Sequence, residues 1–198
     1  MIIRPIKIAI ITSSTDPTNG WGNITCELCR NLWRGALVDL YLPKGSPDIE
    51  GFVGRYFPIL PKMIFSARTP KLISFFLAGL RIYSYSLIGY GTYDIIHSLF
   101  AFPYCITAAV VAKLHRAPLI IGVQGTYGVK PLNQQPDRAL LTWAYRQANQ
   151  IICCSNYTKN RIEKATGIKN IKVIPNGVNY ERFASIADIS ESRGVNES

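Results

Sequence analysis

Runs of apolar and β-branched residues alternate along the chain with longer segments in which apolar residues recur at helical spacing. The runs are apolar throughout, which is typical of strands covered by helices on both faces. Strands are predicted near residues 6–12, 37–42, 93–98, 118–124, 149–154 and 171–174, and helices near 22–34, 70–89, 102–115, 136–148 and 156–165. This alternation predicts an α/β fold with a doubly wound, Rossmann-like, mostly parallel sheet.

Two segments depart from the alternation. Residues 43–69 contain many prolines and glycines, which predicts a long functional loop or an irregular excursion. Residues 184–198 are polar and without periodicity, which predicts a linker or tail after one domain that spans residues 1–183. The length of 198 residues fits a single domain.

The stretch from Leu72 to Tyr90 is long and apolar enough to raise the question of a membrane span. It contains Arg81, Gly79 and several hydroxyl side chains, which favour an amphipathic or buried helix instead.

The formal net charge is +10, and the imbalance is concentrated in the middle of the chain. Between residues 51 and 136 there are eight Lys or Arg residues and one acidic residue, Asp94, so this part should favour an anionic partner. Aromatic and aliphatic residues accompany the basic ones between Phe52 and Tyr90. Two interpretations remain open: a surface that meets anionic lipid, or a core helix whose basic side chains reach solvent. The candidate patch residues are Arg55, Lys62, Arg68, Lys71 and Arg81.

The five cysteines are odd in number and lack the spacing of a disulfide framework, which predicts reduced thiols in the cytoplasm. The run Ile6–Ile11 is too short for a signal-peptide core and is predicted to be the first strand. Cys26 and Cys29 lie within a predicted helix, and the chain has only two histidines, so buried packing thiols are favoured over a redox or metal site. No metal or cofactor is expected.

Candidate chemistry lies at the carboxyl ends of the predicted strands, where doubly wound sheets bind ligands. The first strand is followed by Gly20-Trp21-Gly22-Asn23, which either lets the backbone approach a ligand or caps a helix as an exposed glycine turn. His97 closes the 93–98 strand and could bond a hydroxyl group or hold the next loop.

Two further strands end in polar residues. Gln124-Gly125-Thr126 follows the strand near 118–124, and Ser155 follows the strand near 149–154. Ser155 is favoured as the N-cap of the next helix over a ligand contact. The last predicted strand passes into Pro175-Asn176-Gly177, where proline ends the strand and Asn-Gly forms a turn.

The segment from Ile171 to Phe183 resembles the strand and turn that lead from the first into the second domain of family 4 retaining glycosyltransferases with the GT-B fold. The likeness extends from the first strand to Phe183, with the elements in the family's order. It implies the N-terminal, acceptor-side domain of a hexosyltransferase-type enzyme. Such an enzyme moves a sugar from a nucleotide-sugar donor to a glycan or lipid-linked acceptor with retention and without a metal. The donor-binding C-terminal domain is outside these residues, so the chain alone is expected to be inactive unless that domain or a partner chain supplies the missing half.

The same resemblance assigns roles to the candidate residues. It places the glycine loop near the donor diphosphate and the acceptor, and His97 at the floor of the cleft. Family members commonly have a histidine where this chain has Gln124, and glutamine can position a group but cannot titrate. The cleft candidates are Gly20, Trp21, Gly22, Asn23, His97, Gln124, Gly125, Thr126, Ser155, Asn176 and Gly177. A cytoplasmic location is expected, with peripheral binding to the cytoplasmic face of the membrane as an option.

A non-catalytic basic module on the same sheet, for an anionic membrane or nucleic acid, is the alternative. Nucleic acid is disfavoured because the basic residues are scattered and no recognition motif is present.

Overall fold

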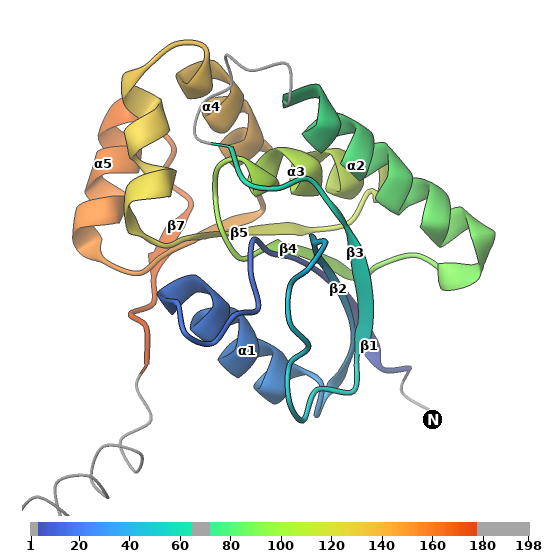
Figure 1. Ribbon diagram of the computed structural model, residues 1–198. Helices are drawn as coiled ribbons and strands as arrows, with labels where there is room; N and C mark the ends of the chain where they lie inside the picture. The colour runs from blue at the N-terminus through green and yellow to red at the C-terminus, as the bar shows by residue number, and fades with distance from the viewer. Residues whose placement is uncertain (1–3, 65–71, 178–198) are drawn as a thin grey trace, which may run out of the picture.

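A computed structural model describes residues 4–64 and 72–177 of the chain (Figure 1). The strands are β1 (Ile6–Ile11), β2 (Ala36–Pro43), β3 (Arg55–Leu60), β4 (Ile95–Ser98), β5 (Leu119–Val123), β6 (Gln150–Cys153) and β7 (Ile171–Val173). The α-helices are α1 (Gly20–Leu32), α2 (Leu72–Tyr85), α3 (Tyr104–His115), α4 (Asp137–Gln147) and α5 (Asn156–Thr166). A π-helical turn, η1 (Ser86–Tyr90), continues α2, and two 3-10 turns, η2 (Gly125–Gly128) and η3 (Lys130–Asn133), precede α4.

The seven strands form one parallel sheet in the order β3-β2-β1-β4-β5-β6-β7. The chain builds the sheet outward from β1 in one direction as far as β3 and then returns to β4 on the other side of β1. β1 is therefore paired along both edges, with Ile11 opposite Tyr41 of β2 and Ser98 of β4. The predicted doubly wound, Rossmann-like sheet is confirmed.

Alternate residues of β1 face different helices because side chains alternate across a strand. Ile8 and Ile10 pack in a core with Cys26 and Cys29 of α1. Ala9 and Ile11 belong to the other core, to which α2 and α3 contribute. Figure 1 shows α1 on one side of the sheet and α2 with α3 on the other. Helices on both faces explain why the strand sequences are apolar throughout.

The interpretation of residues 43–69 as an irregular excursion is wrong for one segment, because Arg55–Leu60 forms β3. This strand pairs only with β2, at the edge of the sheet. An edge strand tolerates the exposed Pro58, whose missing N–H needs no partner on the open side. Proline and partial exposure concealed the strand in the sequence. The predicted domain boundary after residue 183 and the tail lie outside the described residues.

The predicted helix at 70–89 corresponds to α2 and η1. Within residues 4–64 and 72–177, no helix combines the length and apolarity required to cross a membrane.

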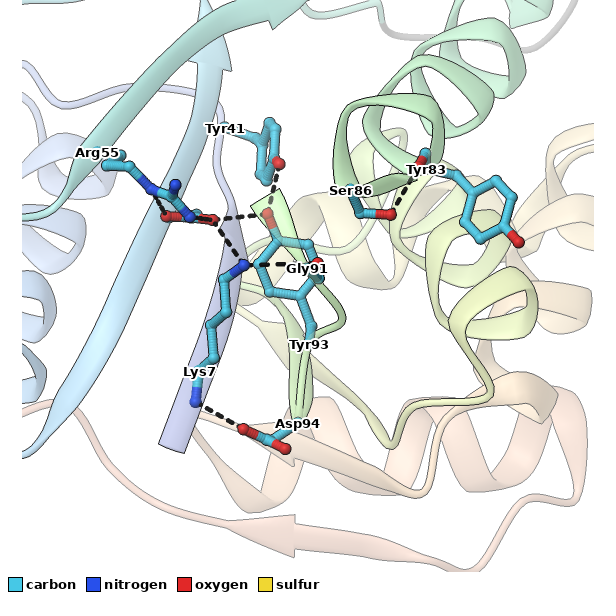
Figure 2. Close-up of polar contacts among 9 residues, drawn as sticks. Lys7, Tyr41, Arg55, Tyr83, Ser86, Gly91, Tyr93 and Asp94 are labelled. Carbon is cyan, nitrogen blue, oxygen red and sulfur yellow. Dashed lines mark hydrogen bonds and ion pairs between the residues drawn. The ribbon is translucent and has the colours of Figure 1, made fainter. Parts of the chain in front are cut away.

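A buried carboxylate, Asp39 on β2, joins three strands near their amino-terminal ends. Arg55 of β3 donates to both of its oxygens, at 2.7 and 2.6 Å. Tyr93 donates its hydroxyl at 2.7 Å, and the Lys7 ammonium of β1 lies 3.8 Å away. Figure 2 shows Lys7, Arg55 and Tyr93 converging here, with Tyr41 bonded to the Tyr93 hydroxyl. Asp39 is only 1% exposed, so its charge depends on these partners.

Replacing this carboxylate should destabilise the sheet. Asp39→Asn keeps the shape but leaves the buried Lys7 ammonium without a counter-charge, so we expect a loss of about 3 kcal/mol in unfolding free energy. Urea denaturation followed by circular dichroism measures it. The control Glu27→Gln breaks an exposed ion pair with Arg30 and should change stability by less than about 0.5 kcal/mol. Equal stability of the two variants would contradict the role assigned to Asp39.

Candidate active site

The candidate site lies where the strand order reverses, at the carboxyl ends of β1 and β4. Loops that leave two neighbouring parallel strands in opposite directions open a crevice, and doubly wound proteins bind ligands there. Here the loop after β1 runs to α1, while the chain after β4 runs to α3 on the other face of the sheet. Residues 12–23 and 97–101 therefore lie at this crevice.

The loop after β1 is fixed by hydrogen bonds of its own. Asn19 is the N-cap of α1 and accepts from the Gly22 N–H at 2.8 Å. Its amide also donates to Ser14 Oγ at 3.3 Å. Gly22 lies so close to Asp16 that a Cβ atom would overlap the Asp16 backbone. The glycine is thus required by the close approach of loop and helix, while Gly20 has open space around its Cα.

A cavity of about 330 Å³ opens beside this loop. It is lined by Ser13, Ser14, Asn19, Gly20, Trp21 and Met63. The Ser13 hydroxyl is buried and has no hydrogen-bond partner among the described residues. A buried hydroxyl without a partner loses roughly 1–3 kcal/mol of solvation that a bound polar group could restore. Ser13 is therefore a candidate ligand contact that is not among the residues predicted from the sequence.

Trp21 links the loops that follow three strands. Its ring lies 5.4 Å from that of Phe100, after β4, and 4.7 Å from that of Tyr127, after β5. The contact with Tyr127 is edge-on, a favourable arrangement for aromatic rings. Trp21 lines the cavity and packs against the loops after β4 and β5. Asn23, one turn into α1, is exposed and does not line this cavity.

His97 is the penultimate residue of β4, opposite Ile10 of β1 and Ile120 of β5. It is half-buried, and desolvation lowers its pKa to about 4. At neutral pH the imidazole is uncharged, so it can donate one hydrogen bond and accept another. This suits contact with a hydroxyl group better than contact with an anion.

The loop after β5 meets the segment after β7. Asn176 donates from its side-chain amide to Gln124 Oε1 at 3.0 Å, although 52 residues separate them in the sequence. Gly125 has φ +74°, a conformation that favours glycine, and turns the chain into η2. Thr126 and Gly177 are exposed. Two of the predicted cleft residues are therefore in direct contact.

Ser155 serves as the N-cap of α5. Its hydroxyl accepts from the Thr158 N–H at 3.3 Å and lies 3.0 Å from Thr158 Oγ1. This is the capping arrangement favoured from the sequence.

The predicted basic patch does not form one cluster in the described residues. Arg55, at the start of β3, is bonded to Asp39, whereas the exposed Lys62 follows the end of that strand. Arg81 is exposed on α2 and donates to the Tyr85 hydroxyl at 3.0 Å. Arg68 and Lys71 lie outside the described residues.

The cysteines of α1 are packing residues. Cys26 and Cys29 are buried between α1 and the sheet. Burial raises the pKa of Cys29 to about 12, which keeps the thiol protonated and unsuited to nucleophilic or ligand chemistry at neutral pH.

Comparison with known proteins places this geometry in context. A family model described as Glycosyltransferase Family 4 matches residues 18–182. An uncharacterized glycosyltransferase of Methanocaldococcus jannaschii is 33% identical over 88 residues, which cover 44% of this chain and 25% of that protein.

Among solved structures, a glycosyltransferase from Rickettsia africae ESF-5 superposes with a TM-score of 0.69 at 15% identity, over 99% of this chain and 51% of that one. Anabaena HepE, in complex with UDP and glucose, gives a TM-score of 0.65 at 16% identity, over 97% of this chain and 51% of that one. At these identities the likeness shows the fold. The chain spans about half the length of these solved structures.

The two glycines of the β1–α1 loop should respond differently to alanine. Gly22→Ala forces the loop away from Asp16, so we expect a loss of about 2 kcal/mol in unfolding free energy and a change in Trp21 fluorescence. Gly20→Ala meets no neighbouring atom and should stay within about 0.5 kcal/mol of the parent. Urea titrations of both variants measure the difference, and equal effects would contradict the close approach.

Proposed function

The chain belongs to glycosyltransferase family 4, and from that premise we propose that it is the acceptor-side domain of an enzyme that transfers a sugar from a nucleotide-sugar donor. The single observation that carries the proposal is the cavity at the carboxyl end of β1, into which the described residues bring the unpartnered Ser13 hydroxyl beside the N-terminus of α1. The cavity lies at the reversal of strand order. The UDP and glucose bound by the structurally similar Anabaena protein support a nucleotide sugar as donor.

The side chains of the cavity suit the recognition of hydroxyl groups, because the Ser13 hydroxyl can donate and accept a hydrogen bond and Trp21 offers an apolar ring. His97 on the neighbouring strand β4 is not part of the cavity lining, and we propose that its neutral imidazole contacts a hydroxyl of the acceptor. Gln124 accepts from Asn176 and cannot titrate, so we assign it a positioning role. In this proposal the present domain binds the acceptor, which is a glycan or a lipid-linked sugar.

We place the donor on a second Rossmann-like domain, because this chain covers only half of the solved glycosyltransferases that it resembles. Transfer is proposed to proceed with retention and without a metal, as the family resemblance implies. The alternative of a non-catalytic basic module is not favoured, since the family match covers most of the chain.

Sugar transfer should require both halves. We expect no turnover of UDP-, GDP- or ADP-sugars by the 198-residue chain with membrane lipid as acceptor, and turnover once a donor-binding domain is supplied in trans. Ser13→Ala should lower the rate of the reconstituted enzyme at least tenfold, because an acceptor contact is lost. Ser84→Ala, exposed on α2, should leave it unchanged.

Product release is measured by mass spectrometry, and the anomeric configuration by NMR. Robust transfer by the chain alone would overturn the half-enzyme proposal. Loss of activity in EDTA, or an inverted product, would overturn the proposed chemistry.

We also propose peripheral binding to an anionic membrane through α2 and η1, on the cytoplasmic side. Five large apolar residues of this segment are at least half exposed: Ile73, Leu77, Leu80, Leu87 and Ile88, here called the α2 stripe. Arg81 lies in the same segment, and residues 51–93 contain no Asp or Glu. Apolar side chains with basic neighbours and no acidic ones fit the interface of an anionic bilayer.

The α2 stripe predicts lipid binding that depends on charge and on apolar contact. We expect the chain to sediment with vesicles containing phosphatidylglycerol, and much less with phosphatidylcholine alone. Leu77→Gln/Leu87→Gln should weaken binding at least tenfold, because two buried leucines contribute several kcal/mol. The control Leu37→Gln/Ile174→Gln removes equally exposed apolar residues elsewhere and should have little effect. Equal binding by both double variants would contradict the proposed surface.

A further inference from the structure

A second and larger cavity, of about 710 Å³, lies at the amino-terminal ends of the strands. It is formed where β1, β2 and β3 begin and where the chain approaches β4. Its lining residues carry three cations and one carboxylate: Arg4, Lys7, Arg55 and Asp39. The candidate active site is at the other ends of the same strands, so this cavity is separate from it.

Lys7 supplies a buried ammonium group whose donors are only partly used. The residue is 9% exposed. Its Nζ donates to the Gly91 carbonyl at a long 3.4 Å and lies 3.8 Å from Asp39 Oδ2, beyond hydrogen-bond distance. It also lies 4.5 Å from the centroid of the Tyr93 ring. An ammonium carries three N–H donors, so Lys7 retains capacity for an acceptor in the cavity.

Asp39 does not serve as that acceptor, because Lys7 Nζ lies 3.8 Å from its nearer oxygen. The carboxylate instead accepts two hydrogen bonds from Arg55 and one from Tyr93. Within the lining, Arg4, Lys7 and Arg55 accompany one carboxylate, Asp39, and Arg4 is also paired with Asp94, so one positive charge remains in excess. A phosphate monoester carries at least one negative charge at neutral pH and would neutralise it.

The remaining wall is apolar and open to solvent. Trp33, Leu37 and Val53 line it and are 37%, 55% and 76% exposed. They lie beside the exposed side chain of Arg4 and the half-exposed one of Arg55. A ligand with an apolar group attached to its anion would cover these side chains as it reached Lys7.

We propose that this cavity binds an organic phosphate monoester, with the phosphate at the Lys7 ammonium and an apolar substituent against Leu37 and Val53. The site is independent of the proposed sugar transfer, because it lies at the amino-terminal ends of the strands and the candidate active site lies at their carboxyl ends. It offers the domain a second ligand, whose binding would bridge the first three strands of the sheet.

Phenyl phosphate is the probe for this site, with binding to the 198-residue chain followed by calorimetry and by amide chemical shifts. We expect saturable binding at one site that shifts the amides of Gly54, Gly91 and Thr92. Inorganic phosphate, which lacks the apolar group, should bind at least tenfold more weakly.

Two variants and two controls test the location. Val53→Glu adds a carboxylate at an exposed position and should weaken binding at least tenfold without disturbing the fold. Lys7→Met removes the ammonium and should abolish binding. Tyr157→Glu and Lys113→Met make the same changes at exposed positions outside the cavity and should change the affinity less than twofold.

Three results would overturn the proposal. The first is the absence of saturation by phenyl phosphate at about 10 mM. The second is an affinity that Val53→Glu leaves unchanged. The third is a set of shifted amides confined to residues 12–23, which would place the anion at the active-site loop instead. None of these outcomes bears on sugar transfer, so this proposal and the glycosyltransferase proposal can fail separately.

Discussion

The pairing of β1 along both of its edges is the constraint on which the rest of the structure depends. A central parallel strand must be buried on both faces, so its neighbours have to be joined by helices that cross over those faces. α1 covers one face and α2 with α3 the other. The chain leaves β1 and β4 toward opposite faces of the sheet, which opens the crevice beside Ser13. The position of the site therefore follows from the order of the strands.

The carboxyl ends and the amino-terminal ends of the strands have different chemistry, and both follow from the topology of the sheet. At the carboxyl ends, loops and a helix N-terminus offer hydroxyl groups, amides and an aromatic ring to a ligand. At the amino-terminal ends, the strands bring charged side chains from β1, β2 and β3 into register around Asp39. Burying that carboxylate is tolerable only because two cations and a hydroxyl surround it. The excess positive charge there is a consequence of holding one acid in place.

Much of this arrangement could be predicted from the sequence, because apolar runs and helical periodicity report burial directly. Six of the seven strands, the helices between them and the cap at Ser155 were predicted in that way. β3 escaped detection, since an edge strand buries only part of its surface and accepts Pro58. Ser13 and the Asp39 cluster could not be found, because an unpartnered hydroxyl and a contact between distant strands exist only in three dimensions. The Ser13-Ser14 pair directly after the first strand was the one local signal.

The bond between Asn176 and Gln124 has a mechanical consequence. It fastens the segment after β7 to the loop after β5. The same loop carries Tyr127, whose ring contacts that of Trp21 in the cavity wall. A force on the segment after β7 would therefore be transmitted to the cavity wall through one hydrogen bond and one aromatic contact.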